Sequence, residues 1–511
     1  MENIEKIRHS LAHIMAQAVL GFWPKTKLGV GPAIENGFYY DILIPKSLTP
    51  EDLEKIEQRM KELIKENQKF IGKKISKATA KKLFKNQPFK LELIKDLPGK
   101  NVGTYQNGKF LDLCRGGHIK NTNEIDINSF KLTKLAGAYW KGSEKNKMLT
   151  RVYGVAFKTE KELMDYLKMQ EEAEKRDHRI LGQKLDLFIF SDLVGKGLPL
   201  FTEKGATIKR ELENFVIEEE IKRGYKHVST PELAKVDLYK KSGHYPYYKD
   251  TMYPVMKIDE EELILRPMTC PHHYQLYLAK PRSHKELPFK IAEIAKQFRY
   301  EKSGELTGLI RVRSFCLADS HIICQKEKVE KEINNVLDLI EYMAKSFGLK
   351  PIVDYRYQLS LGDRKDTKKY YKDDNAWNFA ENVLRTVLKN RKAPYFEVKK
   401  EAAFYGPKID IQMKNFLGKE DTAFTVQYDF VGPKRFELSY INENGKKEEP
   451  IVIHRSSIGC VERTMAFLIE KFAGAFPLWL SPVQVSVIPI SEKHFEYAKK
   501  IRKELEKNNI R

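Results

Sequence analysis

The stretch QFRYEKSGELTGLIRVRSFCLADSHIIC, residues 297–324, decides how the larger part of this chain folds. It predicts two strand-like arms joined by a glycine-bearing loop, and these arms gather Arg299, Glu301, Arg311 and Phe315. Guanidinium groups bind phosphate oxygens, a glutamate accepts a hydrogen bond from an adenine amino group, and a phenylalanine offers a stacking face. The stretch therefore predicts a hairpin that binds ATP without a Gly-rich phosphate loop, with a charged surface hairpin as the alternative at this point.

The segments around this hairpin favour an antiparallel sheet. The apolar runs ELILRPM (262–268), IDIQM (409–413) and FTVQYDF (424–430) alternate irregularly with helical segments, unlike the regular alternation of a parallel α/β fold. Further on, HRSSIGCVERTMAFLIE (454–470) places His454 before, and Arg463 at the start of, an expected helix.

The N-terminal part predicts an α+β domain over residues 1–157. A helix starts at Thr49, with Pro50 at its first position and acidic residues in its first turn. The runs VGPAIENGFYYDI (30–42), FKLELIKDLPG (89–99) and YGVAFKT (153–159) are typical of strands. Thr159 and Glu162 then predict a capping box that begins a charged linker helix over 158–179.

The remaining chain divides into a larger body over 180–474 and a segment over 475–511. The segment consists of an apolar run, LSPVQVSVIPIS (480–491), which predicts a strand, followed by an expected helix over 492–508. Because one strand and one helix cannot close a hydrophobic core, we expect the start of an incomplete α/β domain.

Composition sets the class of the protein. With 511 residues, 41% hydrophobic and 32% charged, we expect about three domains and no membrane insertion. The net charge of +21 suggests a polyanionic partner such as RNA, although a lysine-rich proteome would give the same excess. Five scattered cysteines and the lack of a secretion signal in this sequence predict a reducing, cytoplasmic location.

A second group of reactive side chains lies near the N-terminus. RHSLAHIMAQAV (8–19) spaces His9 and His13 by one helical turn, and LDLCRGGHI (111–119) spaces Cys114 and His118 by the same interval. From spacing alone, metal binding, catalysis and simple packing remain open for these four residues.

Several motifs resemble those of known enzymes. TPEL (230–233), FRYE (298–301) with RVRSF (311–315), and GCVERTMAFLIE (459–470) resemble the three motifs of class II aminoacyl-tRNA synthetases. MTCPHH (268–273), ADSHIIC (318–324), YGPKIDI (405–411) and IHRSSIG (453–459) extend the resemblance to the threonyl-tRNA synthetase family. It implies an α+β fold, with an antiparallel catalytic sheet flanked by helices after an α+β editing domain.

The resemblance also implies a reaction and its partners. The reaction is the ATP-dependent ligation of L-threonine to tRNA(Thr) through a threonyl-adenylate, with hydrolysis of mischarged Ser-tRNA(Thr). Pro231 lies where the family builds a homodimer interface. A catalytically inactive, RNA-binding regulator derived from a synthetase is the alternative.

The family's roles fall on these residues one by one. Arg299 would bind the α-phosphate and the threonine carboxylate, Glu301 the adenine amino group, and Arg311 the distal phosphates together with Mg²⁺. Phe315 and Arg463 would sandwich the adenine. The other implied positions are His244, which assists transfer, and Asp319, Tyr405, Lys408 and Gln427 around threonine.

One Zn²⁺ per chain is implied at Cys270, His321 and His454, with an open position for the substrate's amino and hydroxyl groups. Such a site rejects valine, which has no hydroxyl to bind. Serine lacks only a methyl group, worth about 1–3 kcal/mol, so a second, hydrolytic site is needed. Its implied residues are His9, His13, Lys90, Asp112, Cys114 and His118.

For that second site we expect a metal-free pocket. His118 and Lys90 would help place a water molecule on the seryl ester, and Asp112 would hold the amino group. A similar set in the related alanyl enzymes binds zinc, which keeps a metal as the alternative.

The sequence departs from the family near the threonine pocket. Thr269 stands where asparagine is common, Leu317 where glutamine is usual, and Cys460 where serine is usual, while Ala423 lies in a changed EDTAF segment. The small ubiquitin-like domain that often precedes the editing domain and most of the anticodon-binding domain are not found in this sequence.

Overall fold

The computed structural model describes residues 3–415 and 418–511. The chain divides into two compact units, Met1–Glu171 and Glu172–Arg511. The division falls inside helix α5 (Glu160–Arg176), which lies in the segment expected to be a linker. Among the described helices, none has the length and apolar character needed to cross a membrane.

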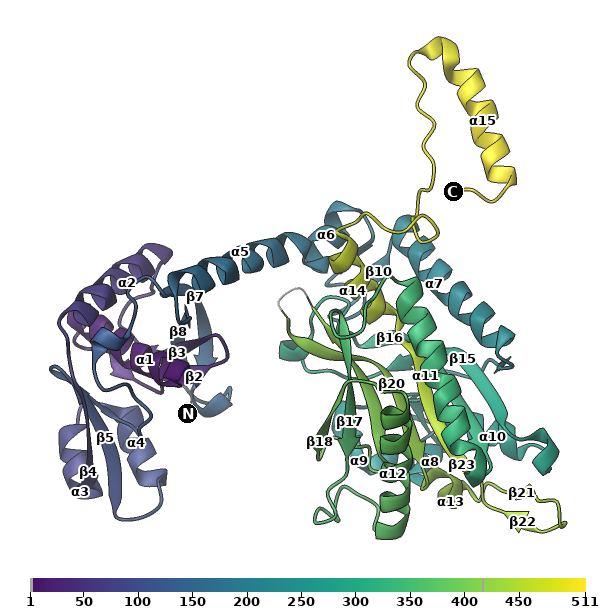
Figure 1. Ribbon diagram of the computed structural model, residues 1–511, viewed down its shortest axis with the longest axis horizontal. Helices are drawn as coiled ribbons and strands as arrows, with labels where there is room; N and C mark the ends of the chain where they lie inside the picture. Colours follow the sequence, from purple (N-terminus) through teal and green to yellow (C-terminus); the bar gives the residue numbers. More distant parts are fainter. Residues whose placement is uncertain (1–2, 416–417) are drawn as a thin grey trace. The chain divides into compact units, whose positions relative to one another are not determined.

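The first unit is built on an antiparallel sheet with the order β1-β3-β8-β7, to which β2 adds beside β3 (Figure 1). A separate three-stranded sheet has the order β4-β5-β6. Helices α1 and α2 pack against the larger sheet and against each other. The elements are α1 (Asn3–Phe22), β1 (Lys27–Leu28), β2 (Ala33–Ile34), β3 (Gly37–Leu43), α2 (Pro50–Lys65), β4 (Phe70–Ser76), α3 (Lys77–Leu83), α4 (Pro88–Asp96), β5 (Asn101–Asn107), β6 (Phe110–Leu113), β7 (Phe130–Tyr139) and β8 (Met148–Ala156).

Helix α2 begins as the sequence predicts. The Thr49 hydroxyl accepts a hydrogen bond from the Asp52 backbone N–H, and the Asp52 carboxylate accepts one from the Thr49 N–H. This capping box satisfies backbone donors that a helix start otherwise leaves unpaired. Buried Ile56 and Met60 then hold the helix against the core.

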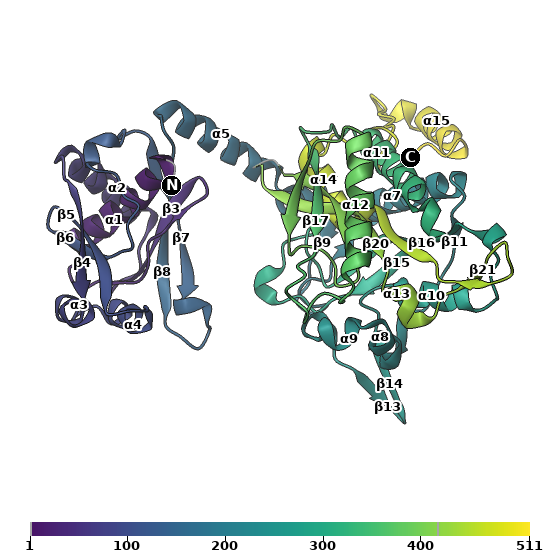
Figure 2. The same ribbon diagram turned by 60° about the horizontal axis from the view of Figure 1, so that its bottom comes forward.

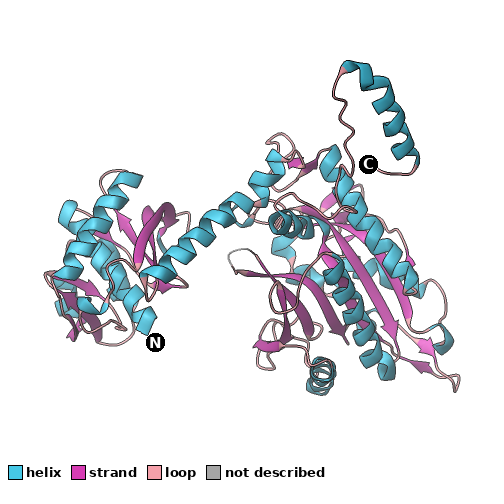
Figure 3. Ribbon diagram, turned by 45° about the horizontal axis from the view of Figure 1, so that its top comes forward, coloured by secondary structure: helices cyan, strands magenta, loops and turns pink. Residues whose placement is uncertain are grey.

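The second unit is built on an eight-stranded sheet with the order β11-β15-β16-β23-β20-β19-β17-β18 (Figures 1 and 3). Its inner pairings are antiparallel, as expected, and only the edge pairs β11/β15 and β17/β18 are parallel. The strands are β11 (Lys226–His227), β15 (Phe289–Phe298), β16 (Ser314–Cys324), β17 (Tyr355–Leu361), β18 (Tyr395–Lys399), β19 (Lys408–Lys414), β20 (Glu420–Asp429) and β23 (Ile451–Cys460).

Helices cover this sheet and close its hydrophobic core. Helix α11 (Val329–Ser346) packs on β20 and β23, and α12 (Asp374–Asn390) packs on β17 (Figure 1). Fully buried side chains such as Ile340 and Trp377 fill the interface. The other helices are α6 (His178–Lys184), α7 (Glu203–Lys222), α8 (Val236–Ser242), α9 (His244–Tyr247), α10 (Cys270–Leu278), α13 (Gly432–Phe436), α14 (Val461–Phe472) and α15 (Phe495–Lys507).

Short strands complete the second unit. A three-stranded sheet with the order β12-β14-β13 ends in the hairpin seen at the bottom of Figure 2. The remaining short strands form two pairs, β9/β10 and β21/β22. Their bounds are β9 (Phe188–Ile189), β10 (Leu200–Phe201), β12 (Leu233–Lys235), β13 (Met256–Ile258), β14 (Glu261–Leu265), β21 (Tyr440–Ile441) and β22 (Lys447–Glu448).

Two predicted strands are wrong. The run over 89–99 forms helix α4, because Pro88 sits in its first turn and Phe89, Lys90 and Ile94 are buried on one face. The run over 480–491 forms no strand; Ile488 is 83% exposed and Ile490 is 96% exposed, and no described strand pairs with them.

Candidate active site

The register of the large sheet brings predicted site residues into one row. His321 on β16 lies directly opposite His454 on β23, which lies opposite Gln427 on β20, which lies opposite Lys408 on β19. Directly opposed residues on neighbouring antiparallel strands point to the same face of a sheet. Four side chains from four strands therefore share one face, although 133 residues separate the two histidines.

A second row lies two residues along the strands, on the same face. Asp319 on β16 is opposite Glu293 on β15 and Ser456 on β23, and Ser456 is opposite Thr425 on β20. The alternation of side chains along a strand makes every second residue available to this face. Asp319, whose carboxylate is predicted to bind the substrate, thus lies beside the predicted metal ligands.

Cys270, His321 and His454 form a compact, buried donor set. One donor atom from each residue lies within 4.8 Å of the others, and the Nε2 of His321 is 2.9 Å from the Nδ1 of His454. Cys270 reaches the row from the start of α10. One thiolate and two imidazoles match the three-ligand zinc sites that keep a position open for substrate.

The protonation states of the Cys270 thiol and the His321 imidazole also bear on whether this donor set can bind a cation. Burial, with the nearby carboxylates of Asp319 and Asp429, raises the pKa of the Cys270 thiol well above its ordinary value. Burial likewise lowers the pKa of His321, so this imidazole stays neutral and keeps a lone pair. A bound dication would favour the thiolate that burial alone disfavours.

Asp429, which the sequence analysis did not single out, orients one member of the donor set. The Nε2 of His454 lies 2.8 Å from the Asp429 carboxylate, which also accepts hydrogen bonds from the backbone N–H groups of Val431 and Gly432. The Nδ1 of His454 is therefore the nitrogen that faces Cys270 and His321. A ligand histidine that donates to a carboxylate is a recurrent arrangement at metal sites.

Gln297 holds the Asp319 carboxylate in place. Its Nε2 donates to the Thr269 hydroxyl at 2.9 Å and to the Asp319 carboxylate at 3.3 Å. Thr269 thus takes part in this contact. Burial raises the pKa of Asp319.

A cavity of about 480 Å³ unites the predicted ATP and threonine residues. All the predicted catalytic-unit site residues line it except Lys408, whose ammonium group pairs with Asp410. The lining residues from the predictions are Cys270, His321, His454, Asp319, Tyr405, Gln427, His244, Arg299, Glu301, Arg311, Phe315 and Arg463.

Arg299 is a partly buried cation on the ATP side of this cavity. Its guanidinium lies 5.2 Å from the centre of the Phe315 ring, and its Nε donates to the Pro267 carbonyl at 3.3 Å. Burial lowers its pKa, yet an arginine remains charged at neutral pH. A partly desolvated positive charge beside an aromatic face suits a nucleotide phosphate near its base.

Arg463, at the start of α14, is fixed by main-chain acceptors. Its Nε donates to the Ile310 carbonyl at 3.0 Å and its Nη1 to the Thr422 carbonyl at 2.6 Å. These contacts tie the guanidinium plane to the loop after β15 and to β20, so it is held ready for stacking.

His244 and Tyr405 complete the threonine side. The Nδ1 of His244 lies 2.8 Å from the Ser242 hydroxyl, and burial lowers the pKa of His244 to about 3. The Tyr405 hydroxyl donates to the Gln427 side-chain carbonyl at 2.5 Å, and the Tyr405 ring stacks on His454. His244 is therefore a neutral imidazole within the cavity.

His178 is a further residue that the sequence analysis missed. Its Nδ1 lies 2.7 Å from the Glu470 carboxylate, and its Nε2 accepts a hydrogen bond from the Leu309 N–H at 3.1 Å. Although Asp177, His178 and Glu470 lie close enough to suggest a metal group, both imidazole nitrogens already have partners. The residue instead joins α6, α14 and the loop between β15 and β16.

In the first unit, the six predicted editing residues come together. His9 and His13 lie on α1, and the Cys114 sulfur is 3.5 Å from the His9 Nε2 and 3.2 Å from the His118 Nε2. The Lys90 ammonium lies 2.5 Å from the Asp112 carboxylate, and the His13 Nε2 lies 3.8 Å from it. Lys90 thus reaches the cluster from α4, the helix that the sequence analysis predicted as a strand.

The charges of this cluster favour neutral imidazoles. Burial lowers the pKa of His118 far below its ordinary value and raises the pKa of the Cys114 thiol to about 11. The Ser10 hydroxyl lies 3.1 Å from the His118 Nδ1 and anchors the ring. Lys90 and Asp112 are both about 2% exposed, so they form a desolvated ion pair.

Most of the missed residues had a sequence signal. Gln297, near the end of β15, precedes Arg299 by two positions, and Asp429 follows Gln427 by two positions within β20. His273, a buried residue of α10, follows Cys270 by three positions, about one helical turn. Each spacing puts the missed residue on the face of a predicted one.

Comparison with known proteins agrees with this geometry. The family described as tRNA synthetase class II core domain (G, H, P, S and T) matches residues 253–472. The family described as Threonyl and Alanyl tRNA synthetase second additional domain matches residues 102–153, which include Asp112, Cys114 and His118.

Similar individual proteins point the same way. The threonine–tRNA ligase of Geobacillus sp. (strain WCH70) is 49% identical over 514 residues, covering 100% of this chain and 79% of that relative. A solved structure of the RNA-binding domain of threonyl-tRNA synthetase from Cryptosporidium parvum Iowa II has a TM-score of 0.62 at 35% identity, covering 65% of this chain and 82% of that one. The putative threonyl-tRNA synthetase ThrRS-1 from Aeropyrum pernix has a TM-score of 0.59 at 31% identity, covering 66% of this chain and 78% of that one. With this identity along its whole length, the chain belongs to the threonine–tRNA ligase family of class II aminoacyl-tRNA synthetases.

Proposed function

We propose that this chain ligates L-threonine to tRNA(Thr) with ATP, through a threonyl-adenylate, and hydrolyses mischarged Ser-tRNA(Thr). The observation that carries the proposal is the single cavity in which Arg299, Phe315 and Arg463 meet Asp319 and the buried cysteine–histidine donor set. One half of this cavity suits a nucleotide, and the other suits a small amino acid with a hydroxyl group.

Activation joins the two substrates across Arg299. The threonine carboxylate oxygen attacks the α-phosphorus of ATP, the new oxygen–phosphorus bond forms, and pyrophosphate leaves with the electron pair of the broken bond. Arg299 stabilises the charge that develops on the α-phosphate, and Phe315 with Arg463 holds the adenine ring. Mg²⁺ bound with ATP supplies further neutralisation of the phosphates. Catalysis is thus positioning and charge stabilisation rather than attack by a protein nucleophile.

Selection of threonine depends on the donor set and Asp319. Cys270, His321 and His454 would hold one Zn²⁺, which supplies a Lewis-acid site for the amino and hydroxyl groups of the substrate. The Asp319 carboxylate, held by Gln297, accepts a hydrogen bond from the threonine hydroxyl. Valine has no hydroxyl to donate to this buried carboxylate, which is the kind of mismatch that binding sites reject most strongly.

Transfer to tRNA needs a proton acceptor for the terminal ribose hydroxyl. His244 is a neutral imidazole in the cavity, held through its Nδ1 by Ser242. It assists removal of the hydroxyl proton as that oxygen attacks the threonyl carbonyl carbon, and AMP leaves.

Editing takes place in the first unit. His118 and Lys90 help place a water molecule on the carbonyl carbon of the seryl ester, and the Asp112 carboxylate holds the substrate ammonium group. The pocket acts without a metal, because hydrolysis of the ester needs a positioned water molecule more than a metal. The donor atoms of His9, His13, Cys114 and His118 lie within 4.8 Å of one another, so a metal in this cluster is the alternative. The extra methyl group of a threonyl ester keeps that ester out of line.

Pyrophosphate exchange tests the proposed function. Purified protein should incorporate labelled pyrophosphate into ATP with threonine, more slowly with serine, and not measurably with valine. An inactive RNA-binding regulator would give no exchange with any amino acid, which would reject the proposal.

Metal content and mass test two further parts of the proposal. Metal analysis should find one Zn²⁺ per chain, lost in Cys270→Ala, whereas two would show a metal in the editing pocket as well. Light scattering at micromolar concentration should give a homodimer, since Pro231 lies in the dimer-forming motif, and a monomer would contradict this. We also propose a cytoplasmic location.

A further inference from the structure

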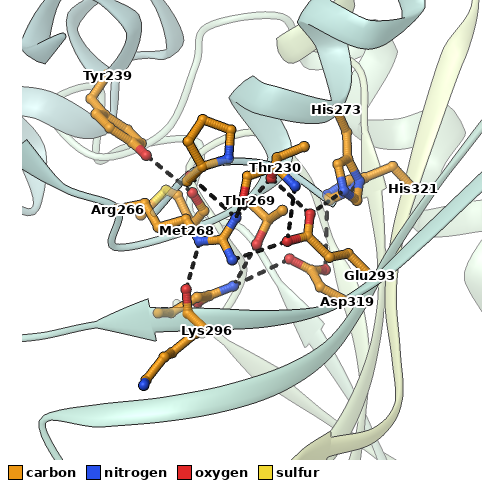
Figure 4. Close-up of polar contacts among 12 residues, drawn as sticks. Thr230, Tyr239, Arg266, Met268, Thr269, His273, Glu293, Lys296, Asp319 and His321 are labelled. Atoms are coloured by element: carbon orange, nitrogen blue, oxygen red, sulfur yellow. Dashed lines mark hydrogen bonds and ion pairs between the residues drawn. The ribbon is translucent and has the colours of Figure 1, made fainter. Parts of the chain in front are cut away.

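A third histidine lies behind the donor set and touches one of its members. His273, on α10, is fully buried, and its Nδ1 lies 2.8 Å from the Nδ1 of His321 (Figure 4). On its other side, the His273 Nε2 lies 3.3 Å from the Glu293 carboxylate. The imidazole of His273 therefore bridges a proposed zinc ligand and a carboxylate.

The hydrogen-bond pattern fixes where each proton must lie. The Nε2 of His321 faces His454 and Cys270, so a metal held there requires a lone pair on this nitrogen. A neutral imidazole then carries its proton on Nδ1, which can only donate toward His273. His273 must accept through its own Nδ1, so its proton lies on Nε2 and points to Glu293.

The far end of this chain of contacts is anchored. Arg266, which is 2% exposed, donates from its Nη2 to the Glu293 carboxylate at 3.0 Å, and the Thr230 hydroxyl donates to the same carboxylate at 2.7 Å. Arg266 is itself fixed by the Lys296 carbonyl, which accepts from its Nε at 2.6 Å. Glu293 is therefore a charged acceptor that cannot swing away from His273.

The two histidine ligands are supported in matching ways. His454 donates directly to the Asp429 carboxylate, whereas His321 reaches the Glu293 carboxylate through one intervening imidazole. In both cases the outer nitrogen has an acceptor and the inner nitrogen is left with a lone pair. Such partners orient a ligand and raise its basicity.

We infer that His273 and Glu293 are positioning residues that lock the tautomer and ring orientation of His321, and so set how tightly the cysteine–histidine site retains Zn²⁺. This inference rests on the zinc centre of the proposed function. It assigns to His273 a role that packing alone does not require, because an apolar side chain would fill the same volume.

Zinc retention in full-length variants tests this inference. His273→Leu removes the acceptor beside the His321 Nδ1, while His273→Asn keeps an acceptor oxygen near the same position. The matched control is His272→Leu, since His272 is also buried on α10 but has no side-chain hydrogen-bond partner among the described residues. Each protein is loaded with Zn²⁺, and the rate of metal transfer to a chromogenic chelator is measured.

We expect zinc to leave His273→Leu about 10–100-fold faster than the wild-type chain, with His273→Asn in between and His272→Leu unchanged. The visible spectrum of the Co²⁺-substituted His273→Leu protein should also change, because its ligand geometry is no longer fixed. Glu293→Gln should speed zinc loss in the same direction, which keeps the test available if His273→Leu does not fold.

Two outcomes separate this inference from the proposed function. Equal zinc loss from His273→Leu, Glu293→Gln and the wild-type chain would overturn the positioning role while leaving threonine activation untouched. A wild-type chain that retains zinc but gives no pyrophosphate exchange would reject the ligase function. It would still allow His273 and Glu293 to position His321. A wild-type chain that binds no zinc would overturn both.

Discussion

Arg311 is paired with Glu301 across the loop that joins β15 and β16, with its Nη2 2.8 Å and its Nε 2.9 Å from the carboxylate. The family resemblance implies that Arg311 binds the distal phosphates of ATP and that Glu301 binds the adenine amino group at the other end of the nucleotide. If both contacts form, ATP binding exchanges this ion pair for contacts with the nucleotide.

Arg311→Ala should weaken ATP binding without weakening the fold. A charge-assisted hydrogen bond contributes about 1.5–3 kcal/mol, so we expect the KM for ATP in pyrophosphate exchange to rise roughly 10–100-fold. The Arg311 side chain is 47% exposed, and exposed ion pairs contribute little to stability, so the melting temperature should stay within about two degrees. An unchanged KM would show that Arg311 does not bind ATP in this chain.

His244→Ala should slow transfer while leaving adenylate formation intact. Loss of a general base costs about 10²–10⁴-fold, and the effect should appear only in single-turnover charging of tRNA. Because burial lowers the pKa of His244 to about 3, its imidazole is neutral across the physiological range. The wild-type transfer rate should thus show no loss from His244 protonation between pH 8 and pH 5, whereas a fall with a midpoint near 6.5 would contradict a buried neutral base.

His118→Ala should separate editing from synthesis. We expect threonine activation at the wild-type rate but accumulation of Ser-tRNA(Thr), because the water molecule is no longer held on the seryl ester. The measurement is deacylation of preformed Ser-tRNA(Thr), with Cys324→Ala, a buried cysteine outside both sites, as the control. Deacylation at the wild-type rate in His118→Ala would refute the editing assignment.

Glu293 should make the fold sensitive to acid. Burial alone would raise its pKa, but hydrogen bonds from His273 and Thr230 and the charge of Arg266 outweigh burial and lower the pKa from 4.5 to about 2. The folded-state pKa lies below the unfolded one, so the stabilisation is present above about pH 4.5 and is lost as pH falls toward 2. The difference corresponds to on the order of 3 kcal/mol.

Urea unfolding as a function of pH, with a chelator present so that zinc release does not contribute, measures this effect. Between pH 4.5 and 2 the wild-type free energy of unfolding should fall more steeply than that of Glu293→Gln. Parallel curves for the two proteins would show that Glu293 is not held as an ionised acceptor.

Much of the catalytic unit could be predicted from the sequence, because polar and charged residues recur at every second position of its strands and therefore lie on one face of the sheet. Arg299 and Phe315 on two expected arms were enough to indicate an antiparallel hairpin with a nucleotide site. The resemblance then assigned Cys270, His321 and His454 together. Local pattern alone could not do so, because it contains no information on which strands become neighbours.

The errors have equally local causes. The alternation in FKLELI predicts a strand as readily as a short helix, and Pro88 decided for the helix. The valines and isoleucines of 480–491 have strand propensity, but a strand also needs a neighbour to accept its backbone hydrogen bonds. Glu293 was missed because a buried polar residue shows its value only through partners that are distant in sequence. The helical spacing of His273 from Cys270 was a signal, but it did not show that His273 contacts His321 and Glu293.

The row formed by His321, His454 and Gln427 makes this site intolerant of changes in strand length. If the start of β23 keeps its register, deleting one residue of β23 before His454 would put Arg455 at the position opposite Gln427 and send the imidazole to the opposite face. Substitutions can adjust selectivity one side chain at a time, whereas an insertion or deletion within β16, β20 or β23 would abolish metal binding, amino-acid selection and adenylate formation in a single step. Length variation among natural relatives should therefore be confined to the loops that join these strands.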